Sequence, residues 1–397
     1  MNVLLAAASF SSQLSGIQRH AFNLARSLLT RIEVSDVHLV VAPWQRDLVR
    51  HSGLEDNPRL QLHIAEMKPN VVSRNFWFYR GLPKLAARLV TDVVHLTYPV
   101  PLKARAFACP IVVTLHDLYP YEIPSNFGFP KAIFNRIILQ RCLGEVDSIA
   151  CVSDITRLRL KQYAADRICN KALRIYNCVE TPSQCAVQGP LQSWSGEPFV
   201  LCVAQHRRNK NIPFLLRVFR RMMRERGIDG AMRLVIIGIA GPETRCIRRM
   251  IVELGLSKQV TLLAGLSEAE LQWCYRYCEA LLAPSTVEGF GLPVVEGLLA
   301  GCRVVCSDIP AFRELGEDAC RYVPLGGNDA EGAFAHAILA ALQEPHREPI
   351  LLSILSADVI AEQYVRLYRK LLTVQKATQG VVLAGSLPSA VSEREIL

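Results

Sequence analysis

Residues 280–315 read ALLAPSTVEGFGLPVVEGLLAGCRVVCSDIPAFREL, and this stretch decides the fold. An apolar strand ends near Pro284, a turn with two glycines and a carboxylate follows, and a short helix comes next. Pro293 begins that helix and Gly301 ends it, which is the usual placement of these residues at helix ends. A second apolar strand over 303–307 follows, so the stretch predicts a strand, loop, helix and strand of a parallel sheet.

The loop of this unit has the chemistry of a ligand site. The following helix points unpaired N–H groups at the carboxyl edge of the sheet, where anions bind in open α/β folds. Gly289 and Gly291 let the backbone approach a ligand closely. Glu288 and Glu296 add two carboxylates, which accept hydrogen bonds from the hydroxyls of a sugar or ribose. The structural alternative is that an acid in a first helical turn is only a partner of the helix dipole.

The longer string favours the ligand site. Glu288-Gly-Phe-Gly-Leu-Pro-x-x-Glu296, with Ala283-Pro-Ser before it and Gly301-x-x-Val-Val-x-Ser-Asp after it, resembles the E-x7-E signature of the retaining glycosyltransferases of family four. The resemblance extends over nearly the whole chain. It implies the GT-B fold, in which two Rossmann-like doubly wound domains face a cleft, and a hexosyltransferase that takes its sugar from a nucleotide-diphosphate donor.

The alternation of strands and helices along the chain also predicts parallel, doubly wound sheets. At 397 residues the chain is longer than chains that fold around one hydrophobic core usually are, so we expect two domains. We place an N-terminal acceptor-side domain at 1–182 and a C-terminal nucleotide-sugar-binding domain at 195–355, joined by a polar linker. In the family the last helix crosses back, so 356–372 is expected to complete the first domain. Residues 376–397 are predicted to form a disordered tail.

Composition narrows the class of protein. No run approaches 18 apolar residues, so we expect no membrane-spanning helix, and the apolar start is interpreted as a buried strand rather than a signal peptide. Thirteen scattered cysteines without a C-x-x-C framework indicate buried thiols in a reducing, cytoplasmic compartment. The excess of nine positive charges suits phosphorylated substrates or anionic lipid. It also suits nucleic acid, but no recognition motif is present, so we expect no nucleic-acid partner.

The resemblance assigns the donor to residues of the C-terminal half. It implies that Glu288 holds hydroxyls of the transferred sugar, Glu296 those of the ribose, and Lys210 the diphosphate. Family members usually carry an arginine just before that lysine, whereas this chain has Asn209 there and Arg208 one step earlier. Arg208 is therefore the arginine candidate by a shift of one position, and a solvated basic loop is the alternative. The remaining donor-binding candidates lie in two turns: Gly265, Leu266, Gly289, Phe290, Gly291 and Leu292.

The strand predicted over 111–117 leaves His116 and Asp117 at its carboxyl end, where sites are built in α/β folds. The resemblance implies that His116 contacts the transferred sugar and belongs to the catalytic set with Glu288 and Lys210. Asp117 is an acceptor-side candidate that could instead cap the loop or orient the imidazole.

The loop after the first strand supplies two more candidates. Ser15-Gly16-Ile17-x-Arg19 resembles the family's loop beside the donor phosphates and the acceptor. Gly16 is accordingly a donor-binding candidate and Arg19 an acceptor-side candidate. The alternative is a turn glycine, which is common for conformational reasons, beside a solvated arginine.

Breaking the bond between the anomeric carbon and the donor phosphate builds negative charge on the leaving diphosphate. Lys210, Arg208 and the amides of Gly291 and Leu292 are placed to stabilise that charge. The resemblance implies retention by same-face attack, in which the leaving phosphate accepts the acceptor's proton and no protein base is needed. No D-x-D string occurs, and we expect neither a metal nor another cofactor.

Residues 129–143 carry an additional signal. Aromatic residues lead into a segment in which Lys131, Arg136 and Arg141 alternate with isoleucines. A basic amphipathic helix of this kind can lie peripherally on the anionic inner face of a membrane. The alternative is an ordinary surface helix whose apolar face packs on the sheet.

Two functions fit these residues. The first is a retaining glycosyltransferase that uses a UDP- or GDP-linked sugar and a glycan or lipid-linked acceptor, in cell-surface polysaccharide synthesis by family analogy. The second is a non-catalytic sugar-nucleotide-binding protein, which Asn209 mildly favours. The presence of Glu288, Glu296, Lys210 and His116 together favours the enzyme.

Overall fold

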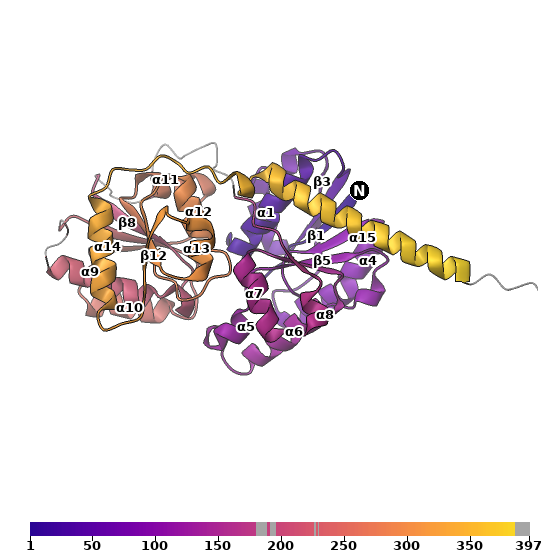
Figure 1. The fold of residues 1–397 in the computed structure, drawn as a ribbon, viewed down its shortest axis with the longest axis horizontal. Helices are drawn as coiled ribbons and strands as arrows, with labels where there is room; N and C mark the ends of the chain where they lie inside the picture. The colour runs from indigo at the N-terminus through magenta and orange to yellow at the C-terminus, as the bar shows by residue number, and fades with distance from the viewer. Residues whose placement is uncertain (180–188, 191–195, 226–227, 229, 386–397) are drawn as a thin grey trace, which may run out of the picture.

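The computed structural model describes residues 1–179, 189–190, 196–225, 228 and 230–385, so most of the predicted linker lies outside it. The described chain forms two α/β units, each built on one parallel sheet (Figure 1). The predicted class, two doubly wound Rossmann-like halves, is confirmed.

The first unit contains a seven-stranded sheet. Its strands are β1 (Asn2–Ala6), β2 (Asp36–Val41), β3 (Leu60–Ile64), β4 (Val93–Leu96), β5 (Ile111–Leu115), β6 (Ser148–Cys151) and β7 (Ala172–Arg174). They lie in the order β3-β2-β1-β4-β5-β6-β7 and every pair is parallel. On the central strand β1, Val3 pairs with Val37 on one side and Val93 on the other. The strands are apolar because helices cover both faces of the sheet.

Helices connect these strands. They are α1 (Gly16–Leu29), α2 (Arg46–His51), α3 (Val71–Phe76), α4 (Leu82–Arg88), α5 (Tyr119–Glu122), α6 (Lys131–Glu145), α7 (Asp154–Tyr163) and α8 (Asp166–Cys169). A π-helical turn, η3 (Trp77–Gly81), joins α3 to α4. Short 3₁₀ turns are η1 (Pro43–Gln45), η2 (Leu54–Asp56), η4 (Ala104–Ala106) and η5 (Pro124–Asn126).

The second unit has six parallel strands in the order β10-β9-β8-β11-β12-β13. They are β8 (Phe199–Val203), β9 (Arg233–Ile237), β10 (Val260–Leu263), β11 (Ala280–Ala283), β12 (Val304–Ser307) and β13 (Cys320–Val323). The helices are α9 (Ile212–Arg224), α10 (Thr244–Glu253), α11 (Glu268–Tyr277), α12 (Leu292–Leu299), α13 (Pro310–Gly316) and α14 (Ala330–Leu342), with 3₁₀ turns η6 (Arg208–Lys210) and η7 (Ser353–Leu355). The stretch 280–315 thus forms β11, α12, β12 and α13.

Helix starts follow the sequence signals. Pro293 lies in the first turn of α12. The Ser267 hydroxyl accepts from the Glu270 amide, and the Glu270 carboxylate accepts from the Ser267 amide, which is the capping arrangement that the sequence predicts. At α7, the Ser153 hydroxyl accepts from the Thr156 amide at 3.0 Å.

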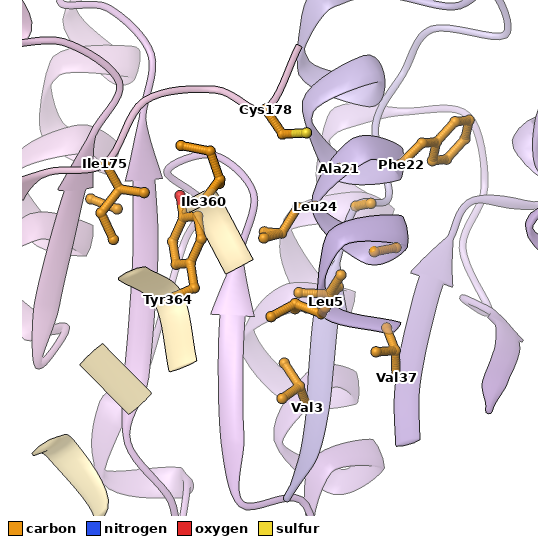
Figure 2. Close-up of a cluster of buried hydrophobic side chains, with 14 of the residues drawn as sticks. Val3, Leu5, Ala21, Phe22, Leu24, Val37, Ile175, Cys178, Ile360 and Tyr364 are labelled. Carbon is orange, nitrogen blue, oxygen red and sulfur yellow. The ribbon is translucent and has the colours of Figure 1, made fainter. Parts of the chain in front are cut away.

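The long C-terminal helix α15 (Ala357–Gly385) crosses from the second unit to the first and packs against α1 (Figure 1). Figure 2 shows Ile360 and Tyr364 of α15 in one cluster with Val3 and Leu5 of β1 and Leu24 of α1. These side chains are at most 1% exposed. Each large apolar side chain buried in this way contributes about 1.5–3 kcal/mol, so α15 belongs to the core of the first unit.

The predicted disorder of 376–385 is wrong, since α15 continues to Gly385. The apolar periodicity weakens there, but no proline interrupts the segment, and a helix continues until a stop signal or unfavourable packing ends it. The rest of the predicted tail, 386–397, lies outside the described residues.

No helix in the described ranges is both long and apolar enough to cross a membrane. The cysteines that the sequence places inside strands and helices, Cys151, Cys202, Cys302 and Cys306, are buried as expected.

Candidate active site

A cavity of about 720 Å³ lies between the two units, at the carboxyl ends of both sheets. Its size is that of a small-molecule site. Almost every residue that the sequence singled out contributes to its wall. These are Gly16, Arg19, His116, Asp117, Lys210, Gly265, Leu266, Glu288, Gly289, Phe290, Gly291, Leu292 and Glu296.

Arg208 is the exception, because its side chain does not line the cavity. Its side chain is 60% exposed, and its Nε lies 3.2 Å from Glu243 Oε1, away from the cavity. Arg207 lines the cavity instead. Residues 208–210 form a 3₁₀ turn, and Arg207 precedes it in extended backbone, so Arg207 and Arg208 do not share one side-chain direction.

Glu288 has a partner on each carboxylate oxygen. Lys210 Nζ lies 2.5 Å from Oε1, and the Tyr119 hydroxyl donates to Oε2 at 3.1 Å. Glu288 is only 5% exposed. Each carboxylate oxygen has a further lone pair, so a sugar hydroxyl can bind beside these two groups or replace one of them.

Asn209, at the position where family members usually carry an arginine, connects the two units. Its Nδ2 donates to the Tyr119 hydroxyl at 3.1 Å and to the Val287 carbonyl at 3.2 Å. Its Oδ1 accepts from Asn126 Nδ2 at 3.1 Å. Asn209 therefore holds Tyr119 against Glu288. Tyr119 and Asn126 were missed, because nothing in their local spacing marks contacts with a segment more than 80 residues away.

The Glu288–Gly289 backbone docks on helix α7 of the first unit. The hydroxyls of Ser153 and Thr156 both donate to the Gly289 carbonyl, the second at 3.0 Å. Arg159 Nη1 donates to the Glu288 carbonyl at 2.9 Å. The strand-to-helix loop of the second unit is thereby held against the first unit at the cavity wall.

A second contact supports this docking. Glu314 of α13 accepts from two amides at the start of α7, those of Asp154 at 2.7 Å and Ile155 at 3.0 Å. A carboxylate at a helix N-terminus satisfies orphan N–H groups and complements the helix dipole. The sequence showed Glu314 only as an acid in a short helix, so this cap between units was not predicted.

His116 lies in the wall with its ring buried. Its Nε2 lies 2.9 Å from the Thr97 carbonyl oxygen, which only accepts, so Nε2 carries the proton. Burial lowers the pKa of His116 to about 4, so the imidazole is neutral near pH 7. A neutral ring with Nε2 protonated leaves Nδ1 as an acceptor for a substrate hydroxyl.

Asp117 has a role within the turn. Its Oδ1 accepts from the Tyr119 amide at 3.0 Å, so it caps the loop, which was one of the predicted alternatives. Burial raises the pKa of Asp117 to about 6, and the nearby Arg207 opposes that rise. No hydrogen bond is recorded between the described side chains of Asp117 and His116.

Arg19, the predicted acceptor-side residue, pairs with two acids of the second unit. Its Nη1 lies 2.7 Å from Glu296 Oε1, and its Nη2 lies 2.9 Å from Glu268 Oε2. The Tyr275 hydroxyl donates to Glu296 Oε2 at 2.7 Å. Glu268 and Tyr275 were not predicted, since Glu268 looked like an ordinary first-turn acid of α11.

Gly291 sets the direction of α12. Its φ of 89° lies in the left-handed region that favours glycine, and α12 starts immediately after it. Because Gly291 and Leu292 line the cavity, the unpaired first amides of α12 are available to an anion there. Among the residues that the structure describes, no cluster of three or more His, Cys, Asp or Glu could hold a metal ion.

Comparison with known proteins gives two family matches. Residues 14–182 match the family described as Glycosyltransferase Family 4, and residues 189–350 match Glycosyl transferases group 1. The two matches follow the two units of the fold.

Curated relatives include two O-antigen enzymes. O-antigen chain mannosyltransferase B of Escherichia coli is 24% identical over 87% of this chain and 91% of its own. O-antigen chain mannosyltransferase RfbU of Salmonella typhimurium is 27% identical over 63% of this chain and 65% of its own.

Solved structures share the fold. Sucrose-phosphate synthase of Thermosynechococcus elongatus aligns with a TM-score of 0.71 at 18% identity, over 94% of this chain and 99% of its own. Anabaena Alr3699/HepE, in complex with UDP and glucose, aligns at 0.61 with 15% identity over 97% and 100% of the chains. WaaG, a glycosyltransferase involved in lipopolysaccharide biosynthesis, aligns at 0.63 with 14% identity over 96% and 99%.

Proposed function

The chain belongs to the glycosyltransferases of family four, and from this we propose that it transfers a hexose from a nucleotide-diphosphate sugar to a glycan or lipid-linked acceptor with retention. The GT-B fold and the glycosyltransferase relatives make it a transferase. The competing binding-protein hypothesis depended on Asn209, and its contacts with Tyr119 and Val287 give that residue a structural role.

One observation carries this proposal: His116, Lys210, Glu288 and Glu296 meet in one cavity although they come from separate segments of both units. Arg207 lines the same wall. Lys210, Arg207 and the first amides of α12 thus line the same cavity. Preorganised groups of this kind stabilise the charge that develops on a leaving diphosphate.

In the proposed reaction the donor exchanges partners at Glu288. A sugar hydroxyl takes the carboxylate oxygen that Lys210 contacts, and the Lys210 ammonium turns to the diphosphate. His116 Nδ1 accepts from another sugar hydroxyl. The bond from the anomeric carbon to the phosphate oxygen breaks, the bond to the acceptor oxygen forms on the same face, and the acceptor's proton passes to the leaving diphosphate. No metal is needed, because Lys210, Arg207 and the amides supply the positive charge.

We propose mannose as the transferred sugar and a bacterial cell-surface polysaccharide of the O-antigen type as the product. The support is the names of the relatives, several of which are mannosyltransferases. The proposed donor is a GDP- or UDP-linked sugar, and the Anabaena protein of similar fold was solved with UDP.

The test is release of nucleoside diphosphate from GDP-mannose, GDP-glucose, UDP-glucose and UDP-galactose in the presence of a bacterial glycolipid extract. We expect one nucleotide class to turn over, with mannose preferred, and the rate to persist in excess EDTA. Turnover that EDTA abolishes and Mg²⁺ restores would contradict the metal-independent mechanism. A lack of turnover with every donor would contradict the proposed function.

A second part of the proposal concerns helix α6. Its inner side buries Ala132, Leu139, Cys142 and Leu143, as an ordinary surface helix would. Yet its outer side also exposes large apolar side chains, which burial on the sheet does not explain. We name this set the α6 surface: Phe129, Ile133, Phe134 and Ile137, of which Phe129 is 85% and Phe134 60% exposed.

Charge complementarity supports an anionic membrane as the proposed partner of the α6 surface. Lys131 and Arg141 are exposed beside it, and α6 has no acid before Glu145. Lys131 also lines the cavity, so this contact would bring a lipid-linked acceptor to the site. We propose a cytoplasmic protein bound peripherally at the inner face of the membrane.

Vesicle binding tests this contact. The double variant Ile133→Asp with Phe134→Asp is expected to weaken co-sedimentation with phosphatidylcholine–phosphatidylglycerol vesicles at least about tenfold. The reason is that two apolar side chains that would be buried in the membrane are replaced by charged ones. The matched control is Ile32→Asp, an apolar residue that is 93% exposed outside α6. Binding that is equal in the double variant, or independent of phosphatidylglycerol, would contradict the proposal.

A further inference from the structure

Arg19 forms salt bridges with two helices of the second unit, and within the described chain no other residue of α1 does so. It extends from the first unit to Glu296 of α12 and Glu268 at the start of α11. The Arg19 side chain is 14% exposed and that of Glu296 is 9% exposed. Figure 1 shows α1 on the side of the first unit that faces α12.

Both oxygens of Glu296 are engaged in this conformation. Oε1 pairs with Arg19 and Oε2 accepts from the Tyr275 hydroxyl. The proposed function gives Glu296 to the donor ribose, so ribose hydroxyls and the Arg19 guanidinium would need the same carboxylate. Separating a buried ion pair of this kind costs free energy, because each buried charge then needs a new partner.

Glu268 offers that replacement. Its Oε2 lies 2.9 Å from Nη2, its Oε1 accepts from Nη1 at 3.2 Å, and its side chain is 44% exposed. Arg19 can therefore leave Glu296 and keep a carboxylate partner. The structure shows Arg19 on both acids, and the same geometry allows a second arrangement with Arg19 on Glu268 alone.

We infer that Arg19 is a latch between the two units that competes with the donor for Glu296. In the latched state the Arg19–Glu296 pair holds the units together and masks the ribose position. The donor binds by exchange: its ribose hydroxyls take Glu296, and Arg19 stays on Glu268. This inference rests on the proposed function, since it takes Glu296 as the ribose partner.

The latch predicts opposite effects of two substitutions on nucleotide affinity. If only a fraction of the protein is in the binding-competent state, the apparent dissociation constant is the intrinsic one divided by that fraction. Removing the latch raises the fraction and therefore strengthens binding. Arg19→Met removes the competitor. Glu268→Gln removes the place that receives Arg19 after exchange, which leaves a buried cation unpaired and weakens binding.

Calorimetric titration with GDP and UDP tests the inference. We expect Arg19→Met to lower the dissociation constant about tenfold, which corresponds to a tenth of the wild type being unlatched, and Glu268→Gln to raise it. Inorganic pyrophosphate, which has no ribose, should bind wild type and Arg19→Met alike. Arg50→Met, an exposed arginine of α2 that pairs with Asp47, is the matched control and should leave the affinity for both nucleotides unchanged.

The outcomes separate the latch from the function. If wild type binds a nucleotide and Arg19→Met binds it equally or more weakly, the latch is overturned and the function stands. If both substitutions weaken binding, Arg19 is a donor-binding or structural residue and the latch is again overturned. If no protein binds either nucleotide, the proposed function fails and the latch fails with it.

Discussion

Lys210→Ala is expected to lower kcat by about a hundredfold to a thousandfold, the usual cost of removing one preorganised group that stabilises transition-state charge. Lys210 is the cation nearest Glu288, at 2.5 Å, and it lines the cavity where the diphosphate would lie. Its loss should act mainly on kcat, because the charge on the diphosphate grows as the glycosidic bond breaks. Steady-state release of nucleoside diphosphate measures the effect.

A control is needed because Lys210→Ala also leaves the Glu288 carboxylate buried without its cation. Breaking a buried pair from one side destabilises a protein by about 3–5 kcal/mol. The double variant Lys210→Ala with Glu288→Gln removes both charges and should recover most of that stability in a denaturation experiment, without recovering turnover. A single variant that keeps more than a fifth of wild-type kcat would refute the role of Lys210.

Gly289→Ala is the second substitution with a large expected effect. A Cβ at this position would lie 1.7 Å from the His116 carbonyl oxygen and 3.2 Å from Thr156 Oγ1. The first is a backbone atom at the end of β5, which cannot move aside. The loop would have to leave α7 and lose the hydrogen bonds at the Gly289 carbonyl.

Since Glu288 is the next residue, its carboxylate would move with the loop, and a displacement of about 1 Å can cost a hundredfold in rate. We expect Gly289→Ala to lose turnover by at least about that factor while the second unit still binds nucleotide. Turnover at the wild-type rate would show that the docked loop is not the catalytic arrangement.

Gly144→Ala is the matched control. A Cβ there meets nothing within 4 Å, and the residue lies in α6. Replacing a helical glycine by alanine is expected to leave turnover unchanged and to raise stability by up to about 1 kcal/mol.

The parts of the molecule that the sequence predicted well are those that depend on local pattern. The unit over 280–315 was predictable because apolar runs, Pro293 and Gly301 mark its strands and its helix within a few residues. Parallel strands bring their carboxyl ends to one edge, so residues that follow strands, such as His116, could be expected to share a site.

The parts that failed depend on contacts between distant segments or on the direction of a side chain. Arg19 and Glu296 are 277 residues apart, and no local spacing predicts their pairing. The same holds for Glu314, whose carboxylate caps a helix of the other unit. The placement of Arg208 depends on a finer detail, because the chain changes from extended backbone at Arg207 to a 3₁₀ turn at Arg208, and it is Arg207 that lines the cavity.

The most direct measurement of the central claim is calorimetric titration of the purified protein with GDP-mannose, GDP-glucose, UDP-glucose and UDP-galactose, without metal. We expect saturable binding of at least one of these donors, with one donor per chain. Because the Arg19–Glu296 pair itself affects donor affinity, Glu296→Gln is compared in the Arg19→Met background, where it should weaken that binding and leave the fold intact by circular dichroism. Absence of binding for every donor, or equal binding by Glu296→Gln in that background, would contradict the assignment of this cavity to a nucleotide sugar.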